Sequence, residues 1–402
     1  MASESGVEDR GAWPALTWES RDWVSTIPRD LMSRSVRERH SGPYRAAVTP
    51  PIAEVVPVLP SGVMSMADDA SIEIAHFDAE LGAEIAPFGA ILLRSESASS
   101  SQIENLTSSA KSIALAELGS RGKRNATEIL ANVRAMQAAI DLSDRLDKDA
   151  IVAMHDALLG AHYPNLVGGW RTDQVWIGGS GFGPHQSDFV APHPERVAEA
   201  MDDLIRFVKR SDVPTLVHAA LAHAQFETIH PFPDGNGRTG RALIHSMLRA
   251  RGLTRNVAVP VSAGLLSDTR SYFDALNAFR SGDPGRIVTM LAEASFTAIV
   301  NGRQLVADLR EARERWSDAI TARRDSVVWR IADLLLRQPV IDAPTARRET
   351  GAPSANTARA IRQLADAGVI TEFGNRKRDR LWQSTEVLSA LDAFAERASR
   401  RR

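Results

Sequence analysis

Helical periodicity runs through the middle of this 402-residue chain and indicates its fold class. Apolar residues recur every three to four positions, which predicts amphipathic helices. The expected helices cover residues 102–118, 127–142, 148–159, 194–210, 213–228, 237–251, 266–281 and 285–322. Residues 168–192 break the pattern with clustered glycines, and Gln174–Gly178 is typical of a short strand that enters a turn. The body is therefore expected to be mainly α, with one glycine-rich β-hairpin.

Residues 321–402 follow a different pattern. The expected elements are helices at 326–337, 343–350 and 355–367 and strands at 369–373 and 381–383. Ser354 is expected to cap the third helix and Gly368 to end it. Three helices followed by a two-stranded hairpin are the layout of a winged helix-turn-helix, an α+β domain.

Length and shifts in composition divide the chain into regions. At ~150 residues per domain, the length alone indicates two to three domains. The expected regions are an N-terminal extension that packs on the main body (1–45), an N-terminal helical lobe (46–165), a helical core (166–318) and the winged-helix region (319–402).

The sequence lacks cysteine and targeting signals. The lack of cysteine excludes disulfides, cysteine nucleophiles and thiolate zinc sites. Glu4, Glu8 and Asp9 stand where a signal peptide would be basic and then apolar. No apolar run approaches the roughly 18 residues of a membrane span. We therefore expect a cytoplasmic protein without a membrane partner.

The formal net charge of −2 is an average over two unlike parts. Residues 321–402 carry 16 Arg and Lys against 10 Asp and Glu, a net +6, which leaves −8 for the remainder. The basic residues of the expected recognition helix and wing are Arg359, Arg362, Arg376, Lys377, Arg378 and Arg380, with Asn356 and Thr357 beside them. This is the charge pattern of a DNA-binding module, although winged helices also bind proteins. Any DNA partner is therefore expected at residues 319–402.

The run from His230 to Arg241 carries the chemistry of the main body. A helix ends before Pro231, and a new helix begins near Gly237 after a tight Asp234-Gly-Asn-Gly turn. Backbone N–H groups at a helix N-terminus bind anions. Arg238 and Arg241 are three residues apart, so both project to one side of the new helix and suit a polyphosphate.

Two further groups complete this run. Asp234 offers a carboxylate for Mg²⁺, which proteins hold by one or two carboxylates plus phosphates. His230 is the titratable group here that works as a base near neutral pH. A lone Gly-Asn-Gly turn or a lone histidine at a helix end would be structural. Their combination with an acid and two arginines within twelve residues favours a functional site.

The run resembles the signature of the Fic family, His-x-Phe-x-(Asp/Glu)-Gly-Asn-Gly-Arg-x-x-Arg, at every defined position, and the resemblance extends over roughly residues 46–310. It implies a Fic-type helical bundle with a β-hairpin flap. It also implies a protein adenylyltransferase that uses ATP and Mg²⁺ to attach AMP to a Ser, Thr or Tyr hydroxyl of a protein, or of itself.

The resemblance also implies residue roles. His230 would deprotonate the target hydroxyl, Asp234 would hold Mg²⁺ and Phe232 would anchor the loop. The ATP-binding residues would be Gly235, Asn236, Gly237, Arg238, Thr239, Gly240, Arg241 and Tyr272, with Tyr272 at the adenine pocket. The hydroxyl would attack the α-phosphorus in line, and pyrophosphate would leave.

A second segment resembles the inhibitory motif of the family, (Ser/Thr)-x-x-x-Glu-(Gly/Asn). It is Ser100-Ser-Gln-Ile-Glu-Asn105, placed upstream of the signature on an expected inhibitory helix at about 100–118. Glu104 near the start of a helix is also what the helix dipole favours, so a plain surface glutamate is the alternative. The resemblance implies a clamp in which Glu104 pairs with Arg241 and keeps the γ-phosphate from its productive pose.

The glycine-rich hairpin is similar to the flap of the family. Its residues Val175, Trp176, Ile177 and Gly178 would hold an extended target segment by main-chain hydrogen bonds. The alternative is an ordinary surface hairpin.

The leading hypothesis is an ATP-dependent protein adenylyltransferase restrained by Glu104. One alternative is a DNA-binding transcriptional regulator whose Fic domain senses a nucleotide. Another is an enzyme that also removes AMP, since an inhibitory glutamate can orient water for that reaction. Helical faces and the flap allow a homodimer.

Overall fold

The computed structural model describes residues 12–25, 27–82, 88–119, 123–374 and 380–400. The chain forms two compact units. The first comprises Met1–Asp69, Ala138–Ala250 and Arg270–Ala292, and the second comprises Ala70–Gln137, Arg251–Thr269 and Glu293–Arg402. The helices that contribute residues to both units are α2 (Ser61–Gly82), α5 (Arg124–Asp141), α11 (Thr269–Arg280) and α12 (Gly285–Ala319).

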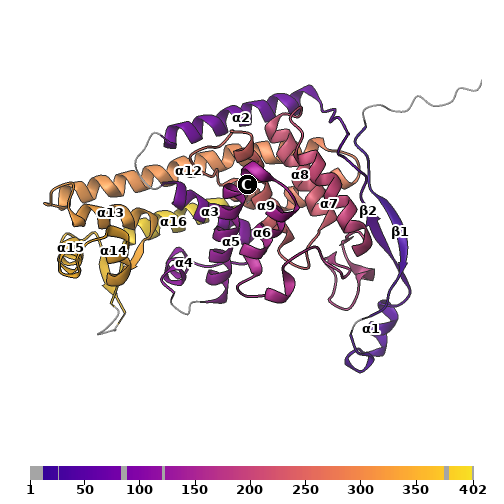
Figure 1. Ribbon diagram of the computed structural model, residues 1–402, viewed down its shortest axis with the longest axis horizontal. Helices are drawn as coiled ribbons and strands as arrows, with labels where there is room; N and C mark the ends of the chain where they lie inside the picture. Colours follow the sequence, from indigo (N-terminus) through magenta and orange to yellow (C-terminus); the bar gives the residue numbers. More distant parts are fainter. Residues whose placement is uncertain (1–11, 26, 83–87, 120–122, 375–379, 401–402) are drawn as a thin grey trace, which may run out of the picture. The chain divides into compact units, whose positions relative to one another are not determined.

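Helix α8 (Thr215–Ile229) is the centre of the first unit. Every residue from Leu216 to Ile229 is buried, because the helix is apolar on all sides. Helices α7 (Pro194–Val208) and α9 (Asn236–Ala250) pack against it, and α6 (Lys148–Leu159) packs against α9 (Figure 1). Helix α11 (Thr269–Arg280) adds Tyr272 to this core. The helices expected at 148–159, 194–210, 213–228 and 237–251 are therefore confirmed, with ends shifted by one or two residues.

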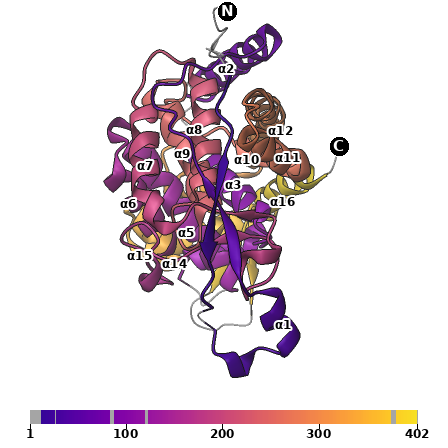
Figure 2. The same ribbon diagram turned by 90° about the vertical axis from the view of Figure 1, so that its right-hand side faces the viewer.

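Two small antiparallel sheets belong to the first unit. Strands β1 (Thr17–Asp22) and β2 (Pro43–Val48) form a ribbon with α1 (Arg34–Arg39) at its end (Figure 2). Strands β3 (Trp176–Ile177) and β4 (Phe189–Val190) form the expected glycine-rich hairpin. The β1–β2 pairing was not predicted. Short 3₁₀ helices lie at Arg29–Leu31, Ser143–Arg145, Pro164–Leu166 and Pro184–Gln186.

The N-terminal extension packs on the first unit, as expected. Trp13 is buried with its ring centroid 6.4 Å from that of Phe207 and 5.4 Å from that of Phe279. The Leu16 N–H donates to the Arg280 carbonyl over 2.9 Å.

The second unit contains α3 (Phe88–Ile103), α4 (Ala110–Glu117) and α10 (Val261–Ser267). The prediction of one helix over 102–118 is wrong, because α3 ends at Ile103 and α4 begins at Ala110. Asn105 has φ +62°, a left-handed conformation that ends a helix and that asparagine tolerates better than most residues. The helix expected at 266–281 is confirmed as α11 with its ends shifted by one to three residues, whereas α10 before it was not predicted.

Residues 327–399 form a C-terminal module of the second unit. Its elements are α13 (Val327–Arg337), β5 (Val340–Asp342), α14 (Ala343–Thr350), α15 (Ser354–Asp366), β6 (Thr371–Phe373), β7 (Leu381–Gln383) and α16 (Thr385–Ser399). The strands form an antiparallel sheet in the order β5-β7-β6. The helices and the hairpin lie where the sequence predicts them, whereas β5 and α16 were missed.

Of the two predictions for the ends of α15, the one for its start is wrong and the one for its end is correct. The helix begins at Ser354 with Pro353 in the capping position, so Ser354 does not cap it. Gly368 has φ +75° and ends the helix region as expected. Among the described residues, no helix combines the length and the apolar character needed to cross a membrane.

Candidate active site

The segment between α8 and α9 forms a compact loop. His230 ends α8 with φ +51°, and its N–H donates to the Phe226 carbonyl over 2.9 Å. Asn236 closes the loop, because its Oδ1 accepts from the Phe232 N–H and its Nδ2 donates to the Phe232 carbonyl, each over 2.8 Å. Asn236 is thus both the first residue of α9 and the brace of the loop before it.

Phe232 is the anchor of this loop, as expected. Its side chain is fully buried and stacks on the His155 ring, with centroids 3.7 Å apart and an angle of 3° between the planes. His155 Nε2 donates to the Asp234 carbonyl over 2.9 Å. Burial lowers the pKa of His155, so its ring is neutral and suited to stacking. The sequence analysis missed His155, because nothing in α6 marks it.

Two glycines of the run are required by close packing. Gly235 has φ +75°, and a Cβ there would lie 2.9 Å from Leu158 Cδ2. A Cβ at Gly240 would lie 2.9 Å from Phe226 Cδ1 and 3.2 Å from Glu227 Oε1. Gly235 therefore lets the loop approach α6, and Gly240 lets α9 approach α8.

The first turn of α9 has the features of an anion site. The N–H groups at the start of α9 have no carbonyl partner within the helix, and the helix dipole is positive there. The Thr239 N–H is the exception in this turn, because it donates to the Gly235 carbonyl over 3.0 Å. Arg238 and Arg241 are 3% and 2% exposed, so both guanidinium groups are held within the protein. Thr239 is fully buried behind them. Gly237 is the second residue of α9 and directly precedes Arg238 in the chain.

Asp234 is the exposed acid of the loop. Its side chain is 59% exposed, and Oδ2 lies 4.0 Å from Arg238 Nη2. Its Oδ1 accepts from the Gly235 N–H over 2.7 Å. Among the described residues, no three His, Asp or Glu side chains gather as a metal cage. One open carboxylate fits Mg²⁺, which takes its remaining ligands from phosphate and water.

His230 lies in a partly enclosed environment with charges of both signs, because Glu227 Oε2 is 3.8 Å from its Nδ1 and the Arg280 and Arg171 guanidinium groups act on it. Its side chain is 18% exposed. Burial, together with the charges of Arg280 and Arg171, lowers the pKa of His230 to about 3. The ring is therefore neutral at neutral pH. Its Nδ1 lies 3.4 Å from the Glu227 carbonyl, so an Nδ1 proton directed there leaves Nε2 to accept a proton.

Arg171 and Arg280 are site residues that the sequence analysis missed. Arg171 is 4% exposed and donates from Nε to the His230 carbonyl over 2.8 Å and from Nη1 to the Asp173 carbonyl over 2.8 Å. Arg280 stacks over the Phe189 ring of β4 at 3.7 Å. Burial lowers the pKa of each to about 10, so both stay charged. In an arginine-rich chain, no sequence signal distinguishes them.

The flap hairpin lies next to these arginines in the first unit. Ile177 of β3 is 36% exposed, and Trp176 Nε1 donates to the Ser180 carbonyl over 2.9 Å. Val175 packs in a cluster with Phe189 of β4. Gly178 has φ +76°, and a Cβ there would collide with the Asp188 carboxylate. The two-stranded sheet leaves an edge of β3 unpaired within the described residues.

Tyr272 is buried rather than exposed in an open pocket. It is 1% exposed, and its hydroxyl lies 2.8 Å from His223 Nε2. Burial and the charge of Arg241 lower the pKa of His223 to about 3. The pair connects α11 to α8 in the core, and a role of Tyr272 in adenine binding stays a prediction.

Glu104 lies at the end of a helix, not at its start as expected. Its N–H donates to the Ser101 carbonyl over 3.1 Å, and the Asn105 N–H donates to the Gln102 carbonyl over 2.9 Å. Asn105 then adopts the left-handed conformation, which explains why asparagine or glycine suits the last motif position. Glu104 belongs to the second unit and Arg241 to the first, so the clamp between them stays a prediction.

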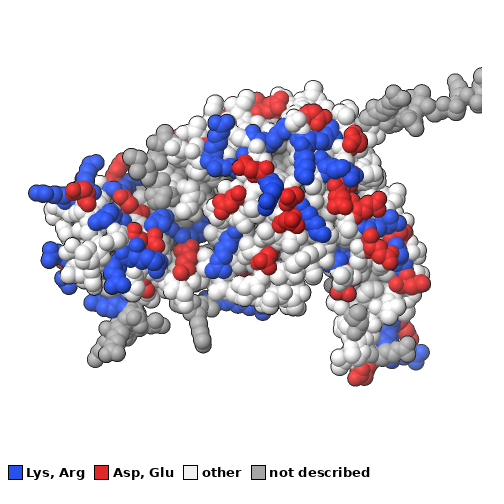
Figure 3. Space-filling model, viewed as in Figure 1, with Lys and Arg blue, Asp and Glu red and all other residues white. Residues whose placement is uncertain are grey.

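The C-terminal module exposes part of the expected nucleic-acid surface. On α15, Asn356, Arg359 and Arg362 are exposed, whereas Thr357 is 2% exposed and its hydroxyl is turned to the Ala352 carbonyl. Thr357 therefore lies on the expected helix but is not part of its exposed face. Figure 3 shows Lys and Arg side chains over this module among fewer acidic ones.

The residues of the expected wing add little to the evidence for a nucleic-acid surface. Arg376, Lys377 and Arg378 lie outside the described residues. Arg380 is exposed and pairs with Glu372.

Comparison with known proteins adds a family assignment for part of the chain. Residues 145–248 match the Fic/DOC family. Protein adenylyltransferase Fic of Nematostella vectensis is 30% identical over 160 residues, 39% of this chain and 34% of that protein. Protein adenylyltransferase fic-1 of Caenorhabditis elegans is 31% identical over 160 residues, 39% of this chain and 28% of that protein. The chain thus spans about a third or less of these curated relatives.

A solved structure extends the likeness in fold. The crystal structure of a Fic family protein from Desulfovibrio desulfuricans covers 84% of this chain and 98% of its own, with a TM-score of 0.52 and 19% sequence identity.

Proposed function

We propose that this protein, which contains a Fic/DOC family domain at residues 145–248, transfers AMP from ATP to a hydroxyl of a protein substrate. The observation that carries the proposal is the α8–α9 loop. It combines a neutral His230, an open Asp234 carboxylate and the N-terminus of α9 with two buried arginines. Its relatives named as protein adenylyltransferases support the choice of AMP as the group transferred.

Each residue of the loop has its own part in the reaction. His230 Nε2 takes the proton of a Ser, Thr or Tyr hydroxyl as the oxygen bonds to the α-phosphorus. The bond from that phosphorus to the bridging oxygen breaks, and pyrophosphate leaves with the electron pair. The first-turn N–H groups of α9, together with Arg238 and Arg241, stabilise the charge of the phosphates.

Mg²⁺, when held by Asp234, would neutralise phosphate charge.

The flap supports the choice of a protein as acceptor. The unpaired edge of β3 at Trp176–Ile177 offers main-chain groups to an extended segment. Such pairing places a hydroxyl without reading much sequence, which suits either a partner protein or a segment of the enzyme itself. Arg171 joins the His230 carbonyl to the backbone of the segment that leads into the flap, so it ties target binding to the base.

Glu104 is proposed to restrain the reaction by pairing with Arg241. The proposal rests on the motif at Ser100–Asn105 and on the position of the partly exposed Glu104 in the turn directly after α3. An enzyme restrained in this way has low activity until the loop moves.

Transfer of labelled AMP tests the proposal. Incubation of E104G with α-labelled ATP and Mg²⁺ is expected to label protein more strongly than the unaltered chain does. Adding H230A to E104G is expected to lower labelling about 100-fold or more, since general-base catalysis contributes at least that much. Labelling that survives in E104G/H230A would contradict the role of His230.

A second function is favoured by the C-terminal module. We propose that it is a winged helix-turn-helix that binds DNA through α15, because Asn356, Arg359 and Arg362 are exposed on one helix in a region of net charge +6. If the Fic domain were inactive, the protein would be a DNA-binding transcriptional regulator. The labelling experiment distinguishes this case from the enzyme, because a regulator would transfer no label even as E104G.

A further inference from the structure

We propose that the C-terminal module (residues 327–399) holds the Glu104 loop in its restraining position, with Asp392 and Lys111 as positioning residues. This inference rests on the proposed function, because it assigns the restraint by Glu104 to a second part of the chain. Every contact that carries it lies within the second unit.

Helices α3 and α4 form one rigid hairpin around the Glu104 loop. Arg94 of α3 donates from Nε to Glu117 Oε1 over 3.0 Å and from Nη2 to Glu117 Oε2 over 2.8 Å. This bidentate pair is mostly buried, so it is harder to separate than a surface ion pair. The connection between the helices is residues 104–109, and its position follows from where the two helices are held.

Helix α16 of the module contacts the chain on both sides of this loop. Before the loop, Gln102 Nε2 donates to Ser399 Oγ over 2.9 Å. After the loop, the Ala110 N–H donates to Asp392 Oδ1 over 3.2 Å. Ala110 is the first residue of α4, so Asp392 places a negative charge at the positive end of that helix. One helix of the module therefore fixes both ends of the Glu104 loop.

The sheet of the module holds the other face of α4. Ala114 packs in a buried cluster with Val340 of β5 and Leu388 of α16. Lys111 Nζ lies 3.8 Å from the ring centroid of Phe373, the last residue of β6. These contacts join α4 to three elements of the module, so a movement of the module carries α4 with it.

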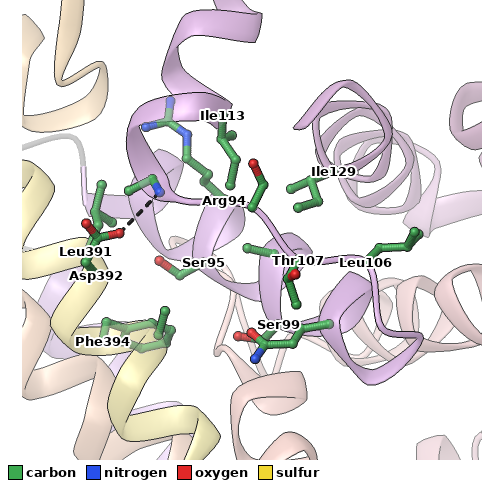
Figure 4. Close-up of a pocket in the computed structure, with 15 residues that line it drawn as sticks. Arg94, Ser95, Ser99, Leu106, Thr107, Ile113, Ile129, Leu391, Asp392 and Phe394 are labelled. Atoms are coloured by element: carbon green, nitrogen blue, oxygen red, sulfur yellow. Dashed lines mark hydrogen bonds between the residues drawn. The ribbon is translucent and has the colours of Figure 1, made fainter. Parts of the chain in front are cut away.

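The contact between α16 and the helical hairpin formed by α3 and α4, called the joint below, is incompletely packed. Figure 4 shows a cavity lined by residues of α3, the Glu104 loop, α4, α5 and α16, with the Ala110–Asp392 hydrogen bond at its side. Its volume of about 50 Å³ admits about three waters. The Ser95 and Ser108 hydroxyls at the cavity have no hydrogen-bond partner among the described residues. A small shift of α16 therefore costs less here than in a close-packed core.

The test compares surface variants that loosen the joint without removing core residues. K111A/D392A is expected to raise AMP transfer about fivefold, which is the effect expected from removing one helix-capping contact and one cation–π contact. K111R/D392N keeps a cation and an oxygen acceptor and is expected to stay near the unaltered rate. R337A, which removes an exposed ion pair inside the module with Glu349, is the matched control and is expected to have no effect.

Hydrogen exchange gives a readout that a general loss of stability does not mimic. Amides of residues 104–112 are expected to exchange faster in K111A/D392A by a larger factor than amides elsewhere in the second unit, and not in R337A. Unchanged exchange at 104–112 would overturn the inference whatever the activity shows. Faster exchange without a rise in transfer, while E104G does rise, would also overturn it. A failure of E104G itself to rise would instead contradict the restraint by Glu104.

Discussion

At the scale of single residues, burial keeps the histidines of the site neutral, while its buried arginines stay charged. His155, His223 and His230 all have a pKa lowered by desolvation, and Arg280 and Arg171 add positive charge beside His230. A neutral His230 is free to accept a proton at neutral pH, whereas a protonated one would not. The same burial makes these histidines sensitive to acid.

The protein is therefore expected to lose stability as the pH falls below 6.5. At His223 and His230 an unfolded chain takes up protons near pH 6.5, while in the folded chain the pKa of each is about 3, so the unfolded state is favoured progressively between these values. Each such histidine contributes a slope of about 1.4 kcal/mol per pH unit. The free energy of unfolding, measured in urea between pH 7.5 and 5, should show this slope.

H223Q tests the origin of the slope. This variant removes one buried titrating ring, so its unfolding free energy should change less with pH than that of the unaltered chain, whatever its value at pH 7. A slope equal to that of the unaltered chain would contradict the assignment.

At the scale of the element, the α8–α9 loop shows what sequence reasoning reaches and where it stops. The His-Pro break and the glycine turn were predicted and are confirmed, because proline and glycine have direct structural consequences. The burial of Phe232 was expected from the family resemblance alone and is also confirmed. Arg171 was missed, since its three carbonyl partners come from segments whose folding brings them together. The break between α3 and α4 was missed because Leu106 continues the apolar spacing across the left-handed Asn105.

G235A should damage this loop through packing. Gly235 and Gly351 both have positive φ, but a Cβ at Gly351 meets nothing within 4 Å, whereas one at Gly235 meets Leu158. G351A should therefore cost about 1 kcal/mol of unfolding free energy for its backbone alone. G235A should cost more and also lower AMP transfer in the E104G background. Equal losses of stability in the two variants would show that contact with α6 has no part.

At the scale of the whole molecule, residues 1–320 carry a net charge of −8 and residues 321–402 carry a net charge of +6, so we expect the proposed nucleotide chemistry in the first stretch and any nucleic-acid contact in the second. The average of −2 hides this division. The sequence predicted the module's helices and hairpin from periodicity and charge. It did not predict α16, whose contacts with α3 and α4 are visible only in the folded chain.

Binding of duplex DNA should depend on α15. R359A/R362A should weaken binding and reduce the salt slope by about 0.9 for each phosphate that these arginines neutralise. R34A, at an exposed arginine of α1 in the first unit, is the control and should bind as the unaltered chain does. DNA binding that does not depend on salt, or that R359A/R362A leaves unchanged, would contradict DNA recognition by α15. The module would then be expected to bind a protein.

The central claim is that His230 and the α9 N-terminus transfer AMP to a protein hydroxyl under restraint by Glu104. Intact-mass and peptide mass spectrometry of E104G after incubation with ATP and Mg²⁺ tests it most directly. We expect the added mass of one adenylyl group on a Ser, Thr or Tyr side chain, absent from E104G/H230A and weak in the unaltered chain. Transfer of a different group would contradict the claim. So would a result in which neither the E104G chain itself nor any added acceptor protein gains mass.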